Sequence, residues 1–203
     1  MSQVRFLPGA REPTPSVVVR RVVIANDAAG RSIVVSDEVL EPVVLETQPG
    51  SEFRLVWGSD RPVRLPSDGT PPDASWIPPA GGFRFGLSVL PPDTGTVPAD
   101  DAAMRQRLEE VRAKLPGLAD ALEPDQPGMH TTDTIDIVYV VGGEVECELD
   151  EGERVTLRTG DCLVQNGTRH AWRNTSDAPC TLAITMIGVP RDPTAAPDRG
   201  RDR

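Results

Sequence analysis

Residues 128–189 contain a series of short β-prone segments, each separated from the next by a turn signal. The turn signals include Gly142-Gly143, Glu151-Gly152 and Asn166-Gly167. Closely spaced short strands of this kind are typical of an antiparallel sandwich or barrel. The segments span residues 135–141, 144–150, 154–157, 162–165, 170–174 and 180–189. The chain is therefore expected to belong to the all-β class, with its barrel core at 128–189.

The region before this core, 16–127, is expected to form an N-terminal β extension. Its β-prone segments are 17–25, 32–35, 42–46, 52–57 and 83–90. Residues 1–15 and 190–203 are rich in proline and charge, and they are expected to form a flexible arm and a disordered tail.

One helical segment is expected near 100–115. Its apolar side chains Met104, Leu108, Val111 and Leu115 recur at the spacing of one helix face. Pro116-Gly117 would stop or kink it. The helix could pack on a sheet as ordinary core, or it could cover the mouth of a pocket.

The charge of the chain limits its partners. It carries 31 acidic and 21 basic residues, a formal net charge of −10. Nucleic acids and anionic membranes are polyanions, so neither is expected to bind. No segment has the roughly 18–20 apolar residues of a membrane span. Residues 1–16 lack the apolar core of a secretory signal, so a cytoplasmic protein is expected.

The three cysteines have no CxxC spacing, which predicts free, mostly buried thiols.

The chain has two histidines, and both lie in the strand-rich region. In an extended segment every second side chain points to the same face. From the first histidine onward, one face would carry His130, Thr132, Thr134, Asp136, Val138 and Val140. The opposite face is also apolar, so this segment is expected to be buried on both sides. His170 begins a later segment whose alternate side chains are Trp172 and Asn174.

Asp136 raises the question of how its charge is compensated. An ionised carboxylate in a buried segment is costly unless a cation or an ion pair balances it. One interpretation is a mononuclear metal site of His130, Asp136 and His170, because two imidazoles and one carboxylate suit Fe(II), Mn(II), Ni(II) or Zn(II). The other is an ion pair between Asp136 and an arginine, with two ordinary barrel histidines. Composition and spacing leave both open.

The same residues resemble the first motif of the cupin superfamily, which contains His-x-His, then a glutamate and then a glycine. His130 matches the first histidine, and Thr132 stands at the second histidine position. Asp136 takes the glutamate position, with Gly143 seven residues further on.

Residues 160–174 resemble the second cupin motif. His170 takes the position of its histidine and Asn174 that of its closing asparagine. The segment is one residue shorter than the usual motif, and Gln165-Asn166 replaces the usual proline stretch. The resemblance covers 128–189.

The resemblance implies a cupin-type antiparallel jelly-roll barrel, usually a dimer, with a catalytic metal held by His130, Asp136 and His170. Fe(II), expected first, would support dioxygenase chemistry. Zn, Mn or Ni would act as a Lewis acid in a lyase, isomerase or cyclase. The expected substrate-binding residues are Thr132, Val138, Val140, Gln165 and Trp172.

These side chains describe a mostly apolar pocket. It would suit a small, largely apolar organic acid or a polyketide-like or aromatic substrate. A non-catalytic, small-ligand-binding cupin is the alternative, because the first motif lacks one histidine. The expected partners are thus a small-molecule substrate and a second copy of the chain.

Overall fold

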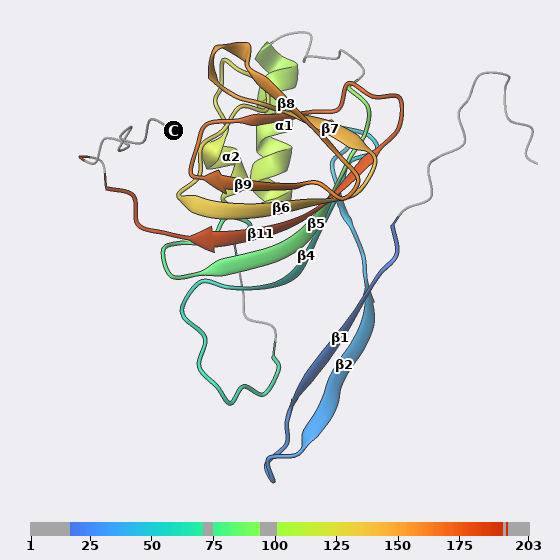
Figure 1. Ribbon diagram of the computed structural model, residues 1–203, viewed down its shortest axis with the longest axis vertical. Coiled ribbons are helices and arrows are strands. Elements are labelled where there is room, and N and C mark those ends of the chain that lie inside the picture. The colour runs from blue at the N-terminus through green and yellow to red at the C-terminus, as the bar shows by residue number, and fades with distance from the viewer. Residues whose placement is uncertain (1–16, 71–74, 94–100, 193, 195–203) are drawn as a thin grey trace, which may run out of the picture.

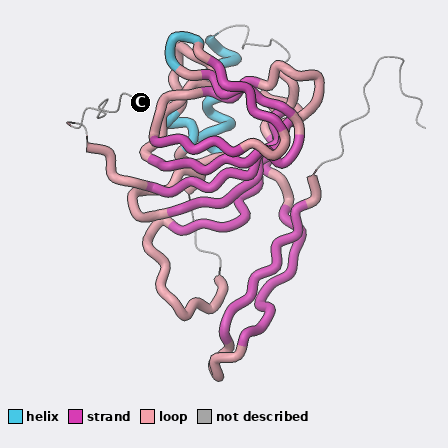
Figure 2. Tube along the Cα trace, in the orientation of Figure 1, coloured by secondary structure: helices cyan, strands magenta, loops and turns pink. Residues whose placement is uncertain are grey.

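The computed structural model describes residues 17–70, 75–93, 101–192 and 194 (Figures 1 and 2). The expected flexible arm and most of the expected tail lie outside these residues. The described strands are β1 (Val19–Asn26), β2 (Ser32–Leu40), β3 (Val43–Val44), β4 (Glu52–Ser59), β5 (Phe83–Leu90), β6 (Thr134–Gly142), β7 (Glu144–Glu148), β8 (Arg154–Arg158), β9 (Cys162–Asn166), β10 (Ala171–Arg173) and β11 (Cys180–Gly188). The helices are α1 (Asp101–Lys114), α2 (Leu118–Ala121) and a 3-10 turn, η1 (Asp150–Gly152).

Two antiparallel sheets form the body of the molecule. One has the strand order β3-β4-β5-β11-β6-β9 and the other β10-β7-β8. Their inner faces share one apolar core, which includes Val138 and Leu182 from the first sheet and Val145 and Leu157 from the second. β1 and β2 pair only with each other and project from the body as a separate hairpin (Figure 1). The all-β, antiparallel barrel expected from the sequence is confirmed.

The strands expected between 128 and 189 are present as β6 to β11. The glycines between them have a physical role. Gly143, in the turn from β6 to β7, has a φ of 91°. A Cβ there would lie 2.6 Å from the carbonyl oxygen of Pro179, so this turn requires glycine.

The barrel extends across the boundary expected at residue 128. β5 pairs with β11 along eight residues, and β4 pairs with β5 on its other side. Part of the expected N-terminal extension therefore belongs to the main sheet. Local sequence patterns do not predict this pairing, because the paired segments are far apart along the chain.

The expectation that β6 is buried on both sides is wrong. Its inner face, including Asp136, Val138 and Val140, is buried. On its outer face, however, Ile137 and Tyr139 are each 45% exposed. The second sheet covers only one face of the main sheet, so no described residue covers the apolar outer residues of β6.

The expected helix is confirmed as α1, although its range is slightly shorter than 100–115. Val111 and Leu115 pack with Leu45 and Ala119 in a second apolar cluster. Glu110 anchors the helix further, since its carboxylate accepts hydrogen bonds from the backbone N–H groups of Glu46 and Thr47. None of the described helices is long and apolar enough to cross a membrane.

Candidate functional site

The two histidines lie next to each other at one end of the barrel. Their backbones form an isolated antiparallel bridge, with N···O distances of 2.9 and 3.0 Å. Their rings lie 4.1 Å apart between centroids and are tilted by 50°. The fold therefore brings together two residues that are distant in the sequence, as the metal-site interpretation required.

Each imidazole meets a backbone carbonyl two residues earlier. His130 Nδ1 is 3.0 Å from the oxygen of Gly128, and His170 Nδ1 is 3.1 Å from that of Thr168. His170 Nδ1 also contacts the Gln165 amide. With the proton on Nδ1, where the Gly128 carbonyl accepts it, His130 presents a lone pair on Nε2, the form in which imidazole ligates metals.

Burial keeps both rings neutral at pH 7. It lowers the pKa of His130, and it lowers that of His170 to about 3, with the neighbouring His130 ring adding to the shift. Desolvation disfavours the charged imidazolium, which explains the direction. Two neutral imidazoles side by side can accept a proton, a hydrogen bond or a metal ion.

Asp136 lies on the inner face of β6, in register with Gln165 of β9 and Met186 of β11. Its Oδ1 is buried without a hydrogen-bond partner, and so is Oε1 of Gln165. Burial raises the pKa of Asp136, while a hydrogen bond from Thr134 opposes the shift. No ion pair involves Asp136 among the described residues, so the structure does not contain the Asp136–arginine pair that the sequence left open.

These groups line one cavity of about 110 Å³ between the sheets. The polar lining is Ser88, His130, Thr132, Asp136, Gln165 and His170. The apolar lining is Phe53, Leu55, Trp76, Ile77, Leu90, Leu118, Val138, Trp172, Leu182, Ile184 and Met186, with Gly86 completing the wall. Neither lysine nor arginine is among these lining residues. The cavity is smaller than most drug-sized pockets, so it suits a small molecule.

Four of the five expected substrate-binding residues line this cavity: Thr132, Val138, Gln165 and Trp172. The ring of Trp172 meets His170 edge-on, with centroids 5.8 Å apart. Val140 does not reach the cavity. It is fully buried with Val145 and Leu182, because it lies further along β6 where the sheets pack closely.

Sequence reasoning missed the part of the wall that comes from before residue 128. Phe53 and Leu55 belong to β4, Leu118 belongs to α2, and Trp76 lies in the loop before β5. The aromatic character of Trp76 was a weak signal, since packing alone accounts for most tryptophans. The ring of Trp76 packs edge-on against Phe53, and the backbone N–H of Trp76 donates to the carbonyl of Pro116, 2.6 Å away.

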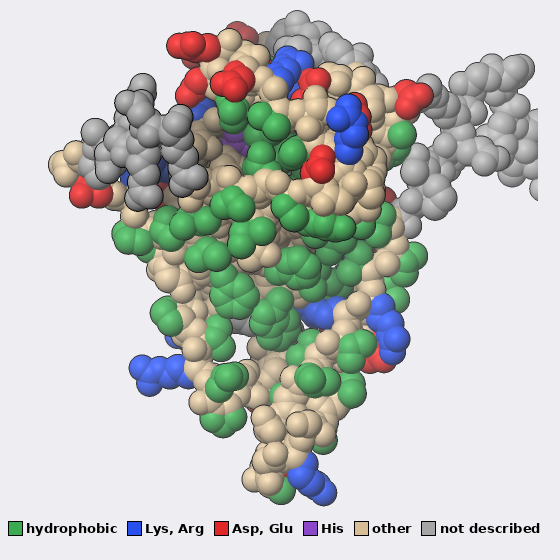
Figure 3. Space-filling model, viewed as in Figure 1, with side chains coloured by type: hydrophobic (Ala, Val, Ile, Leu, Met, Phe, Trp, Pro, Cys, Tyr) green, Lys and Arg blue, Asp and Glu red, His purple; other side chains and the backbone are tan. Residues whose placement is uncertain are grey.

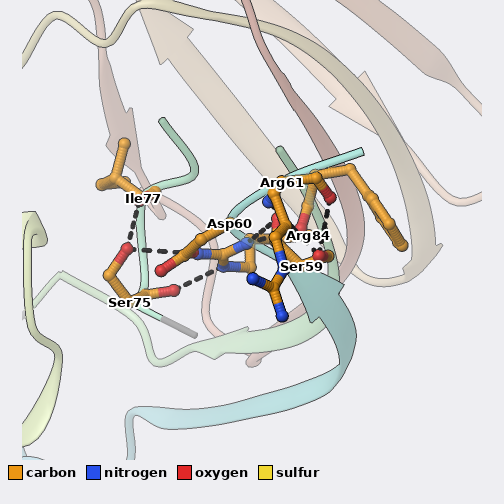
Figure 4. A network of polar contacts seen from close by, with 7 residues as sticks. Ser59, Asp60, Arg61, Ser75, Ile77 and Arg84 are labelled. Carbon is orange, nitrogen blue, oxygen red and sulfur yellow. Dashed lines mark hydrogen bonds and ion pairs between the residues drawn. The ribbon is translucent and has the colours of Figure 1, made fainter. Parts of the chain in front are cut away.

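A buried arginine holds this loop in place. Arg84, fully buried in β5, donates from Nη1 to the carbonyl of Ser59 and contacts Asp60 and Ser75 (Figure 4). Ser75 in turn donates from its hydroxyl to the carbonyl of Ile77, at 2.6 Å. The guanidinium thus holds Ser75 directly and Ile77 through Ser75, on the two sides of Trp76, which lines the cavity.

The polar groups of the cavity match the expected metal in chemistry but not in arrangement. Two neutral imidazoles and an unpartnered carboxylate oxygen are suitable ligands for a divalent transition ion. However, the described residues contain no group of three His, Cys, Asp or Glu side chains gathered closely enough to hold one. The two histidine rings lie 4.1 Å apart between centroids, but Asp136 does not gather with them into such a group.

A family model for the cupin domain matches residues 121–187. These residues are a cupin domain. The match agrees with the strand pattern and with the place of both histidines in the barrel.

Three relatives extend the comparison. Over 59 residues the chain is 45% identical to the oryzines biosynthesis cluster protein J of Aspergillus oryzae, which covers 29% of this chain and 33% of that one. Over 48 residues it is 50% identical to the phomopsin biosynthesis cluster protein C' of Diaporthe leptostromiformis, covering 24% and 25%. Over 97 residues it is 33% identical to a cupin-domain-containing oxidoreductase of Neurospora crassa, covering 47% and 50%. The matches span a quarter to a half of these curated relatives.

Acidification is expected to destabilise the cupin domain through His170. The pKa of His170 is about 3 in the folded chain, against about 6.5 for a free histidine. Between these values the unfolded chain binds a proton that the folded chain does not, so the free energy of unfolding falls as the pH falls. From pH 6.5 to 4.5 this amounts to about 2–3 kcal/mol.

Urea denaturation of the metal-free protein at a series of pH values measures this effect. The variant His170→Gln is the matched control, and its stability should fall less steeply over the same range. Equal slopes for the two proteins would show that His170 is not a buried neutral histidine.

Proposed function

We propose that this cupin domain is a metal-dependent enzyme that acts on a small, largely apolar organic molecule inside the barrel. The observation that carries the proposal is the position of two neutral histidines and an unpartnered Asp136 oxygen in one largely apolar cavity. Buried polar groups without partners are rare in proteins and point to a missing ligand. The names of the relatives, two biosynthesis cluster proteins and an oxidoreductase, support small-molecule chemistry.

His130, His170 and Asp136 would hold the metal. Fe(II) is the first choice, and Zn, Mn or Ni are the others. When bound, such an ion supplies Lewis acidity or, for Fe(II), redox chemistry with molecular oxygen. The reaction would then be a dioxygenation, or an isomerisation, cyclisation or lyase step.

The chain's own residues would bind and orient the substrate. Val138, Trp172 and Trp76 would pack against its carbon skeleton and exclude water. Oε1 of Gln165 is available to accept a hydrogen bond from the substrate, since Nε2 of the same amide donates to the carbonyl of Thr168 at 2.8 Å. The substrate class is an organic acid or a polyketide-like or aromatic compound.

A non-catalytic, ligand-binding cupin is the second candidate. It is favoured by the absence of a three-ligand group among the described residues and by Thr132 at the second histidine position of the motif. The hydroxyl of Thr132 is engaged with that of Thr134, at 2.7 Å. In this case the cavity would bind the same class of molecule without changing it.

Elemental analysis of protein purified without chelator and without added metal separates the two candidates. The enzyme should carry about one transition-metal equivalent per chain, as a mononuclear site requires. Less than about a tenth of an equivalent would contradict the metal site and favour the binding module. Oxygen consumption with small aromatic acids and enolisable carbonyl compounds then distinguishes dioxygenation from Lewis-acid chemistry.

A further inference from the structure

The cavity is polar at one end and apolar at the other. Apart from Ser88, its polar lining belongs to β6 and β9, which contribute Asp136 and Gln165, and to the segments that lead into β6 and β10. At the other side of the main sheet, β4 contributes Phe53 and Leu55. A molecule that fills the cavity therefore needs an apolar body and a polar group at the end formed by β6 and β9.

Two buried oxygens at this polar end have no hydrogen-bond partner. They are Oδ1 of Asp136 and Oε1 of Gln165. The two residues are register partners in the ladder between β6 and β9, so their side chains point to the same face with Cβ atoms about 5 Å apart. Both residues are almost completely buried, at 7% and 5% exposed. Buried acceptors without donors are rare and costly, so this pair indicates that the cavity receives a hydrogen-bond donor.

The side-chain amide of Gln165 has a fixed orientation. Its Nε2 donates to the carbonyl of Thr168 at 2.8 Å and also contacts Nδ1 of His170. Because a carbonyl oxygen only accepts, the amide nitrogen must lie on this side and Oε1 on the other. Turning the amide over would place two oxygens against each other. Oε1 is therefore held in position as an acceptor.

The charges around the cavity exclude a charged group at this acceptor. Neither lysine nor arginine lines the cavity, and Asp136 is the one carboxylate among the lining residues. A ligand carboxylate at Oε1 of Gln165 would meet a lone pair there and a second negative charge beside it. The ion that we propose for His130, His170 and Asp136 would repel a cationic group in turn. An uncharged donor is the group that remains.

The polar end of the cavity is accessible from outside. His130 is only partly buried, although it lines the cavity. Figure 3 shows a small area of histidine surface set back among hydrophobic side chains. The exposed part of His130 therefore lies where a small molecule can enter.

We propose that the substrate carries an uncharged hydroxyl, as in a phenol or an enol, and that Gln165 selects it by accepting its hydrogen bond at Oε1. This inference rests on the proposed function, which places an aromatic or polyketide-like molecule in the cavity. It narrows that class, because the carboxylate of an organic acid has no proton to donate to Oε1. Gln165 is then a residue that determines substrate specificity.

A matched pair of fluorinated probes tests the proposal. The probes para-fluorophenol and para-fluorotoluene share one ring, and only the phenol has a hydroxyl donor. Fluorine NMR titrations of the full-length protein should give a dissociation constant at least about tenfold lower for para-fluorophenol, because the methyl group leaves Oε1 unpaired. In chelator-treated protein, para-fluorobenzoate should bind more weakly than para-fluorophenol, since both Asp136 and Oε1 disfavour an anion.

The variant Gln165→Met removes the acceptor and keeps a side chain of similar length. It should bind para-fluorotoluene as the native protein does, while its preference for the phenol should fall below about threefold. Asn166→Leu is the matched control, because Asn166 is the next residue of β9 and its amide is exposed outside the cavity. This control should keep the full preference. Circular dichroism checks that both variants are folded.

Three results would overturn the proposal. They are equal affinities of the native protein for the phenol and toluene probes, a full preference in folded Gln165→Met, and tighter binding of para-fluorobenzoate than of para-fluorophenol to chelator-treated protein. The first and third use the native chain, so they decide the matter even where Gln165→Met fails to fold.

Metal content separates this inference from the proposed enzyme. A hydroxyl preference in protein that is purified without a transition metal would contradict the metal-dependent enzyme and uphold the role of Gln165. Metal-loaded protein without the preference would uphold the metal site and overturn the role of Gln165.

Discussion

Replacing His170 by alanine is expected to abolish the metal binding that we propose for the cavity. His170 is 2% exposed and its ring faces His130 in the cavity, so no other imidazole of the chain can take its place. Loss of one of three ligands should lower the metal affinity by more than the roughly 10–100-fold that is typical of losing a supporting residue. His130→Ala should have the same effect. Mass-spectrometric metal analysis of proteins purified in parallel measures it.

Two neighbouring variants control this prediction. Thr132→Ala should keep its metal, because the Thr132 hydroxyl is engaged with Thr134. Asp136→Asn should weaken metal binding, since it removes the carboxylate charge. A His130→Ala protein with full metal content would contradict the ligand assignment. Unchanged metal in Asp136→Asn together with lower stability would assign Asp136 a purely structural role.

Replacing Arg84 by methionine is expected to cause the largest loss of stability. The Arg84 guanidinium is fully buried and satisfies the carbonyls of Ser59 and Phe83 and the hydroxyl of Ser75 (Figure 4). Methionine fills a similar volume but leaves these acceptors buried without donors. Removing one partner of a buried polar network costs about 3–5 kcal/mol. Urea denaturation at pH 7 measures the change.

The same substitution should loosen the wall of the cavity. Ser75 precedes Trp76, so the Trp76 ring should gain freedom, and ligands that contact it should bind more weakly. Arg84→Lys is the control, because it keeps the charge but cannot donate to as many acceptors, and an intermediate loss is expected. A loss below about 1 kcal/mol in Arg84→Met would show that water replaces the guanidinium.

The strands of the barrel core could be predicted from the sequence because their signals are local. The turns around Gly143 and Gly167, and the alternation of side chains along β6, depend on residues within a few positions. The same alternation placed His130 and Asp136 toward one cavity, and the cupin motifs added His170. Metal ligation, the identity of the metal and the cytoplasmic location stay predictions.

Other features could not be predicted because they depend on contacts between distant segments. β5 joins β11, and Trp76 reaches the cavity from a loop whose sequence indicates only a turn-rich connection. The side chain of Val140 points inward, as the alternation along β6 predicts. It lies where the two sheets meet, however, so it packs in the core and does not line the cavity. The exposure of Ile137 could not be predicted either, because it depends on whether another layer packs on the outer face of the main sheet.

The amino-acid sequence by itself determined the strands of the barrel core, the inward direction of His130 and Asp136, and the confinement of the histidines to one domain. Turn chemistry and the two-residue period of a strand are properties of neighbouring residues. Only the tertiary structure decided which strands share a sheet, which side chains close the cavity and which apolar face lacks cover. Those outcomes depend on non-local pairing and on the number of layers that pack together, which local patterns do not encode.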